Sequence, residues 1–368
     1  MPINEIAIIG LGVIGGSLGK ALKARLPLVK VTGIDVNVVA VKAAKDLGIV
    51  DEGTASMEEG VFGADLVFLA TPVPVMAEVC RRIAPFLKKG AIITDVGSTK
   101  ENVVNLMRDI LPGTVHYVGG HPMAGSEKSG LAGASELLFE NAVYILTPTA
   151  ETPPEATQAV SEIVESLGAR VMVLSPQEHD RKVAAVSHLP HLIASALVNT
   201  VGEREARERG YFALAAGGFR DTTRIASSSS EMWCDILLEN SEALLPLVGE
   251  FKKTLSAMER IIKNKNRRSL QRMLVSARLW RNKVPTGMKG ILPQVYELTV
   301  AVPDRPGVIG EISTLMGRNN INIIDIEIMR IREGDEGVIR LGFAKEKEME
   351  KAEEVLEKHC FNVRKYDV

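Results

Sequence analysis

The sequence has few cysteines and no excess of charge of either sign. Its 368 residues include three cysteines, Cys80, Cys234 and Cys360, which are far apart and not in a metal-ligand spacing. This pattern argues against a disulfide framework and favours a reduced compartment, with all three expected as packed thiols. Lysine and arginine number 44 against 46 for aspartate and glutamate, so the chain as a whole has no net positive field for nucleic acid or an anionic membrane.

The sequence also lacks a basic leader and a long apolar run. Met1 leads directly into a strand-like segment at Ile6–Ile9, and we find no apolar run as long as a membrane span. We therefore expect a soluble cytoplasmic protein whose partners are small molecules, with no nucleic acid and no membrane among them.

The length exceeds one typical hydrophobic core and predicts two or three domains. In residues 1–175, short apolar runs alternate with helical patterns, which predicts an α/β fold with a parallel, doubly wound, Rossmann-like sheet. The expected strands are Ile6–Ile9, Val31–Ile34, Leu66–Ala70, Ala91–Val96, Val115–Val118, Ala142–Leu146 and Ala169–Leu174.

The rest of the chain divides into three regions. Residues 176–283 carry apolar residues at helical spacing and no strand pattern, which predicts an all-helical domain. Residues 284–294 combine Pro, Gly and Lys and are predicted to form a linker. Residues 295–368 follow a βαββαβ order, which is typical of a ferredoxin-like domain.

A glycine motif follows the first predicted strand. In Gly10-Leu11-Gly12-Val13-Ile14-Gly15, the three glycines permit a tight turn, approach of backbone amides to a pyrophosphate, and close helix packing. Asp35 ends the next strand, twenty residues after Gly15, where its carboxylate suits the ribose hydroxyls of NAD and repels the phosphate of NADP. The plainer interpretation is a glycine turn and a solvated aspartate.

Two polar segments follow later strands of the sheet, close to the edge where open α/β sheets bind ligands. We expect His121 to lie in a loop and to accept the proton of a hydroxyl group as hydride leaves the adjacent carbon. Ser98 would orient the same hydroxyl. The alternatives are that His121 only bonds the backbone of a turn and that Ser98 is an ordinary helix N-cap.

The helical region contributes Ser187-His188-Leu189-Pro190-His191 and a segment around Arg224. His188 and His191 are three apart, but no acidic ligand follows at a suitable spacing, so no metal is expected. The Arg224 guanidinium can bind a substrate carboxylate through two hydrogen bonds, although an ion pair with Asp221 is equally consistent with the local sequence. Trp233 is expected to serve packing.

Four segments together resemble the prephenate dehydrogenase family over roughly residues 3–290: GSTK, GGHPMAGSEKSG, SHLPH and GGFRDTTRIA. The resemblance implies the NAD-dependent oxidative decarboxylation of prephenate to 4-hydroxyphenylpyruvate in tyrosine biosynthesis. It further implies a homodimer formed through intertwined helices of the second domain. No helical chorismate mutase segment precedes the glycine motif, so a monofunctional enzyme is expected.

The same resemblance implies roles for individual residues. His121 would hydrogen-bond the ring hydroxyl of prephenate and take its proton, and Ser98 would contact that hydroxyl. His191 would lie near the pyruvyl side chain, Arg224 would hold a substrate carboxylate, and Glu127 would belong to the polar rim of the cleft.

The third domain resembles an ACT domain, a type that binds amino acids, often between paired copies. The residues expected to bind an effector, for which L-tyrosine is the proposed molecule, are Asp304, Gly307, Asn320 and Asn322.

Two other classes of function stay open on the sequence. One is a different oxidoreductase of the same architecture, such as an arogenate dehydrogenase or a 3-hydroxyacid dehydrogenase. The other is a non-catalytic sensor of amino acids that keeps NAD as a ligand, which the presence of His121, Ser98 and Arg224 argues against.

Overall fold

The computed structural model describes residues 2–125, 130–284, 296–303, 305–329 and 336–365. The chain divides into two compact units, Met1–Arg267 and Arg268–Val368, which are described separately below. The first unit holds a large sheet with its helices and a set of helices that follows it. The second unit holds a small sheet.

The large sheet of the first unit has eight strands in the order β3-β2-β1-β4-β5-β6-β7-β8. Their bounds are β1 Glu5–Ile9, β2 Lys30–Ile34, β3 Glu52–Thr54, β4 Leu66–Leu69, β5 Ile92–Asp95, β6 His116–Pro122, β7 Val143–Thr147 and β8 Arg170–Val173. The doubly wound, Rossmann-like fold is thereby confirmed. Strand β3 was not expected, because its three residues, Glu-Gly-Thr, form no apolar run.

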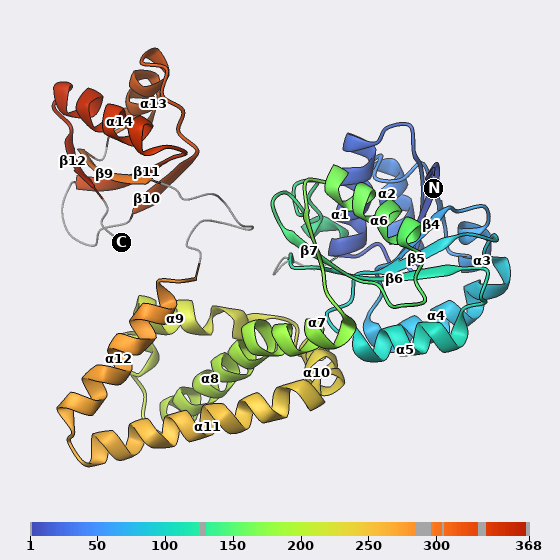
Figure 1. Ribbon diagram of the computed structural model, residues 1–368, viewed down its shortest axis with the longest axis horizontal. Helices are drawn as coiled ribbons and strands as arrows, with labels where there is room; N and C mark the ends of the chain where they lie inside the picture. Colours follow the sequence, from blue (N-terminus) through green and yellow to red (C-terminus); the bar gives the residue numbers. More distant parts are fainter. Residues whose placement is uncertain (1, 126–129, 285–295, 304, 330–335, 366–368) are drawn as a thin grey trace. The chain divides into compact units, whose positions relative to one another are not determined.

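Helices cover both faces of this sheet, as Figure 1 shows. They are α1 Val13–Arg25, α2 Val38–Asp46, α3 Met57–Val61, α4 Val73–Ile83, α5 Glu101–Ile110 and α6 Pro154–Ser166. Strand β1 illustrates why: Ile6 and Ile8 are buried against α1 and α6, whereas Ala7 and Ile9 are buried against α3, α4 and α5. Successive strand residues point to opposite faces, so a continuous apolar run requires cover on both sides.

One pairing departs from the predicted parallel sheet, because β7 runs antiparallel to β6. A parallel crossover needs a dozen or more residues and is usually an α-helix. Between β6 and β7, the described residues contain only the short 3₁₀ turn η2, Leu131–Gly133. Pairing with β7 keeps β6 extended as far as Pro122.

After the sheet, the described residues of the first unit are helical and contain no further strand, so the all-helical prediction is confirmed. The elements are α7 Pro176–Val183, η3 Ala184–His188, α8 Leu189–Arg207, η4 Phe212–Leu214, α9 Gly217–Thr223, η5 Arg224–Ser227, α10 Ser230–Glu239 and α11 Ser241–Lys263. A single π-helical turn, η3, joins α7 to α8, and there the Leu189 N–H bonds the Ala184 carbonyl. Pro190 has no N–H to donate, which accounts for the irregular turn.

The helical stretch Pro176–Arg207 is long and apolar enough, by length and composition alone, to cross a membrane. The expectation that no segment reaches this length is therefore wrong by this measure. Core helices of soluble proteins meet the same criterion. This stretch also buries His179, Asp180, His188 and His191, whose polar atoms would be costly in lipid.

The second unit contains α12 Arg267–Arg281 and a four-stranded antiparallel sheet in the order β10-β11-β9-β12. Its remaining elements are β9 Tyr296–Pro303, α13 Val308–Arg318, β10 Asp325–Met329, β11 Glu336–Phe343, α14 Glu346–Lys358 and β12 Asn362–Lys365. The βαββαβ order is confirmed. Almost all of the predicted linker, residues 285–294, lies outside the described residues.

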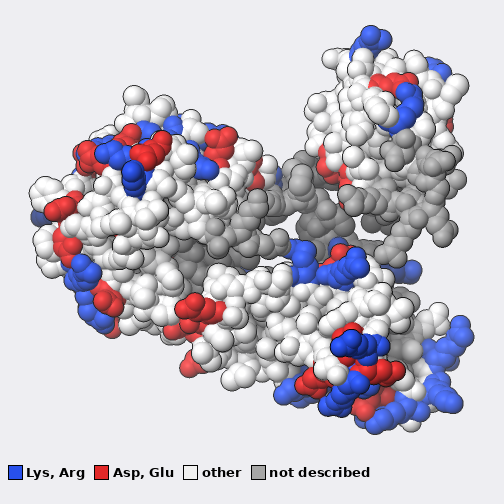
Figure 2. All heavy atoms as spheres, turned by 180° about the vertical axis from the view of Figure 1, so that it is seen from behind, with Lys and Arg blue, Asp and Glu red and all other residues white. Residues whose placement is uncertain are grey.

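The near-zero net charge of the chain averages over different surfaces. In Figure 2, both signs are interspersed over the part that holds the eight-stranded sheet, whereas Lys and Arg gather around α12 at the lower right. Helix α12 has five arginines and no acidic residue.

The cysteines were expected as three packed thiols, and this holds for Cys80 alone. Burial raises the pKa of the Cys80 thiol to about 12, whereas Cys234 and Cys360 are exposed.

Candidate active site

The glycine motif forms the turn between β1 and α1. Gly10 has φ of +98°, and a Cβ at this position would lie 2.5 Å from the Ala70 carbonyl oxygen. A Cβ on Gly15 would lie 1.8 Å from the Gly10 carbonyl oxygen, whereas one on Gly12 would meet nothing within 4 Å. Gly10 and Gly15 are therefore required by packing. The space beside Gly12 is open, so a pyrophosphate can approach there. Val13 and Ile14 begin α1, whose N-terminal amides suit an anion.

Asp35 follows β2, and its carboxylate already organises the turn. One oxygen accepts the Leu11 N–H at 2.7 Å and the other accepts the Asn37 N–H at 2.8 Å. Asn37 in turn caps α2 by accepting the amides of Val39 and Ala40. Asp35 thus links the glycine turn to the end of β2, which is the position where a ribose diol meets a carboxylate in dinucleotide-binding folds.

Ser98 lies in the connection between β5 and α5, three residues beyond Asp95. Ser98 does not cap α5, because the N-cap residue is Lys100. The Lys100 side chain makes no capping hydrogen bond. A buried ion pair between Lys100 and Asp95 holds the connection. Asp95 also accepts the Tyr117 hydroxyl at 2.6 Å and the Gly97 N–H at 2.8 Å, so the Ser98 loop has a rigid base.

His121 lies within β6 and not in a loop, which corrects the prediction. Its partner across the antiparallel pair is Ile145, and 8% of the residue is exposed. Burial holds the pKa of His121 well below its usual value, and the neighbouring His179, Lys100 and His188 lower it further. His121 is therefore neutral near neutral pH and able to accept a proton.

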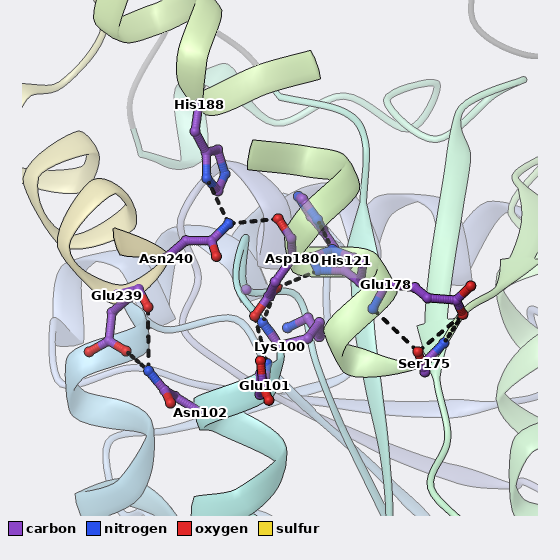
Figure 3. Close-up of polar contacts among 12 residues, drawn as sticks. Lys100, Glu101, Asn102, His121, Ser175, Glu178, Asp180, His188, Glu239 and Asn240 are labelled. Carbon is purple, nitrogen blue, oxygen red and sulfur yellow. Dashed lines mark hydrogen bonds and ion pairs between the residues drawn. The ribbon is translucent and has the colours of Figure 1, made fainter. Parts of the chain in front are cut away.

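The helix α7 brings two further polar side chains to His121. His121 Nδ1 lies 2.7 Å from His179 Nε2, and His179 Nδ1 lies 2.7 Å from Asp180 Oδ1. Asp180 also accepts the backbone N–H groups of Lys100 and Glu101, each at 2.8 Å, and thereby caps α5 (Figure 3). One carboxylate thus connects α7, α5 and the histidine of β6.

A second group of histidines lies on η3 and α8. The His188 ring meets Asn240 Nδ2 at 3.0 Å, and the same Asn240 amide bonds the Asp180 carbonyl at 2.9 Å (Figure 3). Burial, as the largest cause, lowers the pKa of His188 to about 4. His191 stacks on Trp233 with ring centroids 3.6 Å apart and planes 7° from parallel. Burial also lowers the pKa of His191.

Arg224 begins the turn η5, which packs against α8, the helix that carries His191. Arg224 takes part in at least one polar, ring or electrostatic interaction, so its side chain is not without a partner. Glu127 lies outside the described residues, as does Asp304.

The remaining proposed effector residues lie at opposite ends of α13. Gly307, with φ of +92°, is its N-cap, and Asn320, with φ of +55°, follows its C-terminus. Asn322 is exposed just beyond. A helix of 11 residues is about 16 Å long, so one amino acid cannot touch Gly307 and Asn320 of the same copy.

The sequence analysis missed His179, Asp180, Asn240 and Lys100. A signal for the first two was available, since Ser175-Pro176 with Glu178 is a helix start and places an adjacent His-Asp pair in the second turn. Trp233 was expected as packing, and its ring in fact stacks on a proposed site residue.

Comparison with known proteins identifies the family. The nucleotide-binding domain model of prephenate dehydrogenase matches residues 18–173, and its dimerization domain model matches residues 175–276. The prephenate dehydrogenase of Bacillus subtilis is 39% identical over 355 residues, which cover 96% of each chain. The chain belongs to the prephenate dehydrogenase family. The resemblance noted in the sequence is thereby confirmed, and an ACT domain model matches residues 296–361.

Solved structures of the family share the fold. A prephenate dehydrogenase from Aquifex aeolicus, in complex with hydroxyphenyl propionate and NAD+, has a TM-score of 0.73 at 36% identity, covering 77% of this chain and 99% of that one. A Synechocystis arogenate dehydrogenase has a TM-score of 0.68 at 31% identity, covering 76% of this chain and 100% of that one. The family therefore includes enzymes named for both substrates.

Proposed function

We propose that this chain is an NAD-dependent prephenate dehydrogenase, which converts prephenate to 4-hydroxyphenylpyruvate in tyrosine biosynthesis. The observation that carries the proposal is the position of His121. It is a buried histidine with a lowered pKa, on β6 at the carboxyl-terminal edge of a sheet whose β1 ends in a glycine turn. Its motif and the relatives at high coverage support the same reaction.

The glycine turn and Asp35 fit NAD. A Cβ on Gly12 would meet nothing within 4 Å, Val13 and Ile14 begin α1, and Asp35 follows β2 where dinucleotide-binding folds bind the adenosine ribose. NAD supplies a hydride acceptor. Because a carboxylate repels a 2′-phosphate, we expect turnover with NAD to exceed turnover with NADP.

The substrate is held by groups from both parts of the first unit. Ser98 and His121 hydrogen-bond the ring hydroxyl, and Arg224 binds a carboxylate. His191 lies near the pyruvyl side chain and Glu127 at the rim of the cleft. The Arg224 guanidinium, by binding the carboxylate through two hydrogen bonds, fixes the orientation of the substrate relative to the cofactor.

The reaction balances with a single proton acceptor. As hydride leaves the ring carbon, His121 takes the proton of the hydroxyl on that carbon. The bond to the ring carboxylate then breaks and releases carbon dioxide, and its electron pair completes the aromatic ring. The ring oxygen takes the proton back from His121, which restores the neutral histidine.

The test is NADH absorbance with NAD and prephenate, in parallel with NAD and arogenate. Prephenate-dependent reduction of NAD is the expected result. A preference for arogenate is the second candidate, which the match to the Synechocystis enzyme favours. No turnover of either, with NAD still bound, would leave a non-catalytic sensor and overturn the proposal.

We further propose a soluble, cytoplasmic homodimer that is inhibited by L-tyrosine at the ACT domain. The match of residues 175–276 to a dimerization domain supports the dimer, and the match of residues 296–361 to an ACT domain supports an effector site. Because Gly307 and Asn320 lie at opposite ends of α13, a site that uses both needs two copies. Tyrosine should inhibit the full chain but not a chain ending at Lys289. Equal inhibition of both would place its action in the catalytic cleft.

A further inference from the structure

His121, His179 and Asp180 form a buried series of hydrogen bonds that ends in a carboxylate. Both contacts measure 2.7 Å, and the three residues are 8%, 0% and 5% exposed. The two histidine rings meet edge to face, with centroids 5.0 Å apart and planes at 64°. With an ionised carboxylate and two neutral rings, such a series has only one arrangement of its protons.

The carboxylate end of the series fixes the direction of both bonds. Both oxygens of Asp180 accept backbone N–H groups from the start of α5 (Figure 3). Oδ1 also meets His179 Nδ1. The positive end of the α5 dipole stabilises the ionised form. An ionised carboxylate has no proton to give, so His179 Nδ1 is the donor.

The remaining protons follow from that assignment. A neutral His179 that donates through Nδ1 has a lone pair on Nε2. The hydrogen of this contact must then be on His121 Nδ1, because His179 Nε2 has none, so His121 is the donor. In this tautomer the lone pair of His121 is on Nε2, the nitrogen that His179 does not contact.

We propose that Asp180 and His179 are positioning residues that hold His121 in the Nδ1–H tautomer and thereby make Nε2 the proton acceptor. The assignment of the tautomer follows from the contacts alone. Its consequence for turnover rests on the proposed function.

The local sequence places these two side chains without a special backbone conformation. Ser175 and Glu178 form a capping box that starts α7, so His179 and Asp180 follow in the second turn. Adjacent residues on a helix point about 100° apart. One side chain can therefore reach β6 while the next reaches the N-terminus of α5.

The pH dependence of the series involves several neighbours. The titratable and charged side chains around His121 come from α7, η3, the β5–α5 connection, β5 and β7: His179, Asp180, His188, Lys100, Asp95 and Tyr144. Protonation of His121 occupies Nε2, the acceptor nitrogen, so loss of activity at low pH follows from protonation of this ring.

The first experiment is Asp180→Asn in the full chain, with kcat and KM measured across pH. An amide has one donor end and one acceptor end, so the exchange no longer fixes the direction of the series and allows a hydrogen on His121 Nε2. We expect kcat to fall by about 10²–10⁴-fold at every pH, with KM and NAD affinity little changed, as the same exchange does in the Ser-His-Asp triad. A loss that is recovered at high pH would contradict the proposal.

A matched control separates the series from the capping of α5. Asn102 lies in the first turn of α5 and bonds the Glu239 carboxylate and carbonyl, which is a second tie between α5 and the helical region (Figure 3). Asn102→Ala should lower thermal stability only slightly, because exposed polar contacts contribute little, and should leave kcat within about threefold of the parent, because the described bonds of its side chain are to Glu239. A comparable loss of kcat in both variants would mean that Asp180 acts only through α5.

Exchanges at His179 test the middle of the series. Gln can still accept the His121 Nδ1 hydrogen, whereas Leu leaves it without a partner. We expect His179→Gln to retain at least about tenfold more kcat than His179→Leu, because an unpaired buried donor is costly. Equal activity of the two variants would overturn the role of His179.

The tautomer of His121 can also be measured without an activity assay. The protein is labelled with ¹⁵N-histidine, and the chemical shifts of the ring nitrogens are recorded at a pH above the pKa of His121. The His121 signals among the six histidines are identified by their loss in His121→Asn. The Nδ1–H form is expected in the parent and the Nε2–H form in Asp180→Asn. An Nε2–H form in the parent overturns this proposal, whereas absence of prephenate oxidation with the expected shifts would contradict the proposed function alone.

Discussion

The two buried histidine groups of the first unit differ in how their hydrogen bonds end. The series from His121 through His179 ends in the Asp180 carboxylate, which has a full charge and is held by two helix amides. The other group ends in neutral partners, with His188 on the Asn240 amide and His191 on the Trp233 ring.

This difference separates two uses of histidine. A carboxylate fixes which ring nitrogen has the hydrogen and stabilises the positive charge that a base acquires. A neutral amide or an indole ring fixes the orientation of a histidine but offers little stabilisation to a charged one. We therefore expect the first group to govern turnover and the second to govern stability at low pH and substrate binding.

The largest expected effect comes from removing the base. His121→Asn should keep folding and NAD binding but lower kcat by about 10²–10⁴-fold, the usual contribution of a positioned general base. Steady-state kinetics with prephenate measures it, and His116→Asn, at the start of the same strand, is the matched control. Turnover within a few fold of the parent would contradict the comparison.

The second prediction concerns stability at low pH. Folding lowers the pKa of His188 from 6.5 to about 4, so the unfolded chain binds the proton more readily and stability falls as the pH drops through this range. The loss attributable to His188 should reach about 3 kcal/mol once the pH is below the folded pKa.

Urea unfolding at a series of pH values measures this loss. Replacing His188 by Gln removes the titrating group and should flatten the dependence between about pH 6.5 and 4. His121 keeps its own contribution in that variant, because its pKa is also lowered. An unchanged slope would show that His188 is not protonated on unfolding in this range.

The third prediction tests binding of the substrate. Arg224→Ala should raise KM about ten- to a hundredfold and change kcat less, because a charge-assisted bond is lost in both the ground and the transition state. Arg220→Ala, an exposed arginine on α9, is the control. If Arg224→Ala instead lowered kcat with KM unchanged, Arg224 would act on the transition state.

The sequence was sufficient for the class of fold but not for its exceptions. Apolar runs such as Ile6–Ile9 predicted a sheet covered on both faces, because continuous burial leaves no other arrangement. Strand β3 has no apolar run, and the direction of β7 depends on pairing that local pattern does not record. The error over His121 followed from that direction, since pairing with β7 extends β6 through His121.

The parts of the candidate site that could be predicted are those whose residues lie in one short segment of the sequence. The glycines and Asp35 have a fixed spacing with a physical reason, and the glycine turn is formed as expected. His121 and His179 are 58 residues apart, and Lys100 and Asp180 are 80 residues apart. Contacts at such separations depend on how α7 packs against the sheet, which no local pattern expresses.

The smallest expected effect concerns Trp233 and sharpens the comparison most. Its ring stacks on His191, whose Nδ1 is buried without a hydrogen-bond partner among the described residues. The stack is thus the main restraint that the described contacts give to this ring. Stacked aromatic pairs contribute about 0.5–1.5 kcal/mol, so Trp233→Leu should raise KM by roughly two- to tenfold with kcat little changed. The only other tryptophan, Trp280, is exposed on α12 and supplies the control Trp280→Leu. If Trp233→Leu lowered kcat as much as His121→Asn, the neutral group would also take part in proton transfer, and the division between the two histidine groups would be wrong.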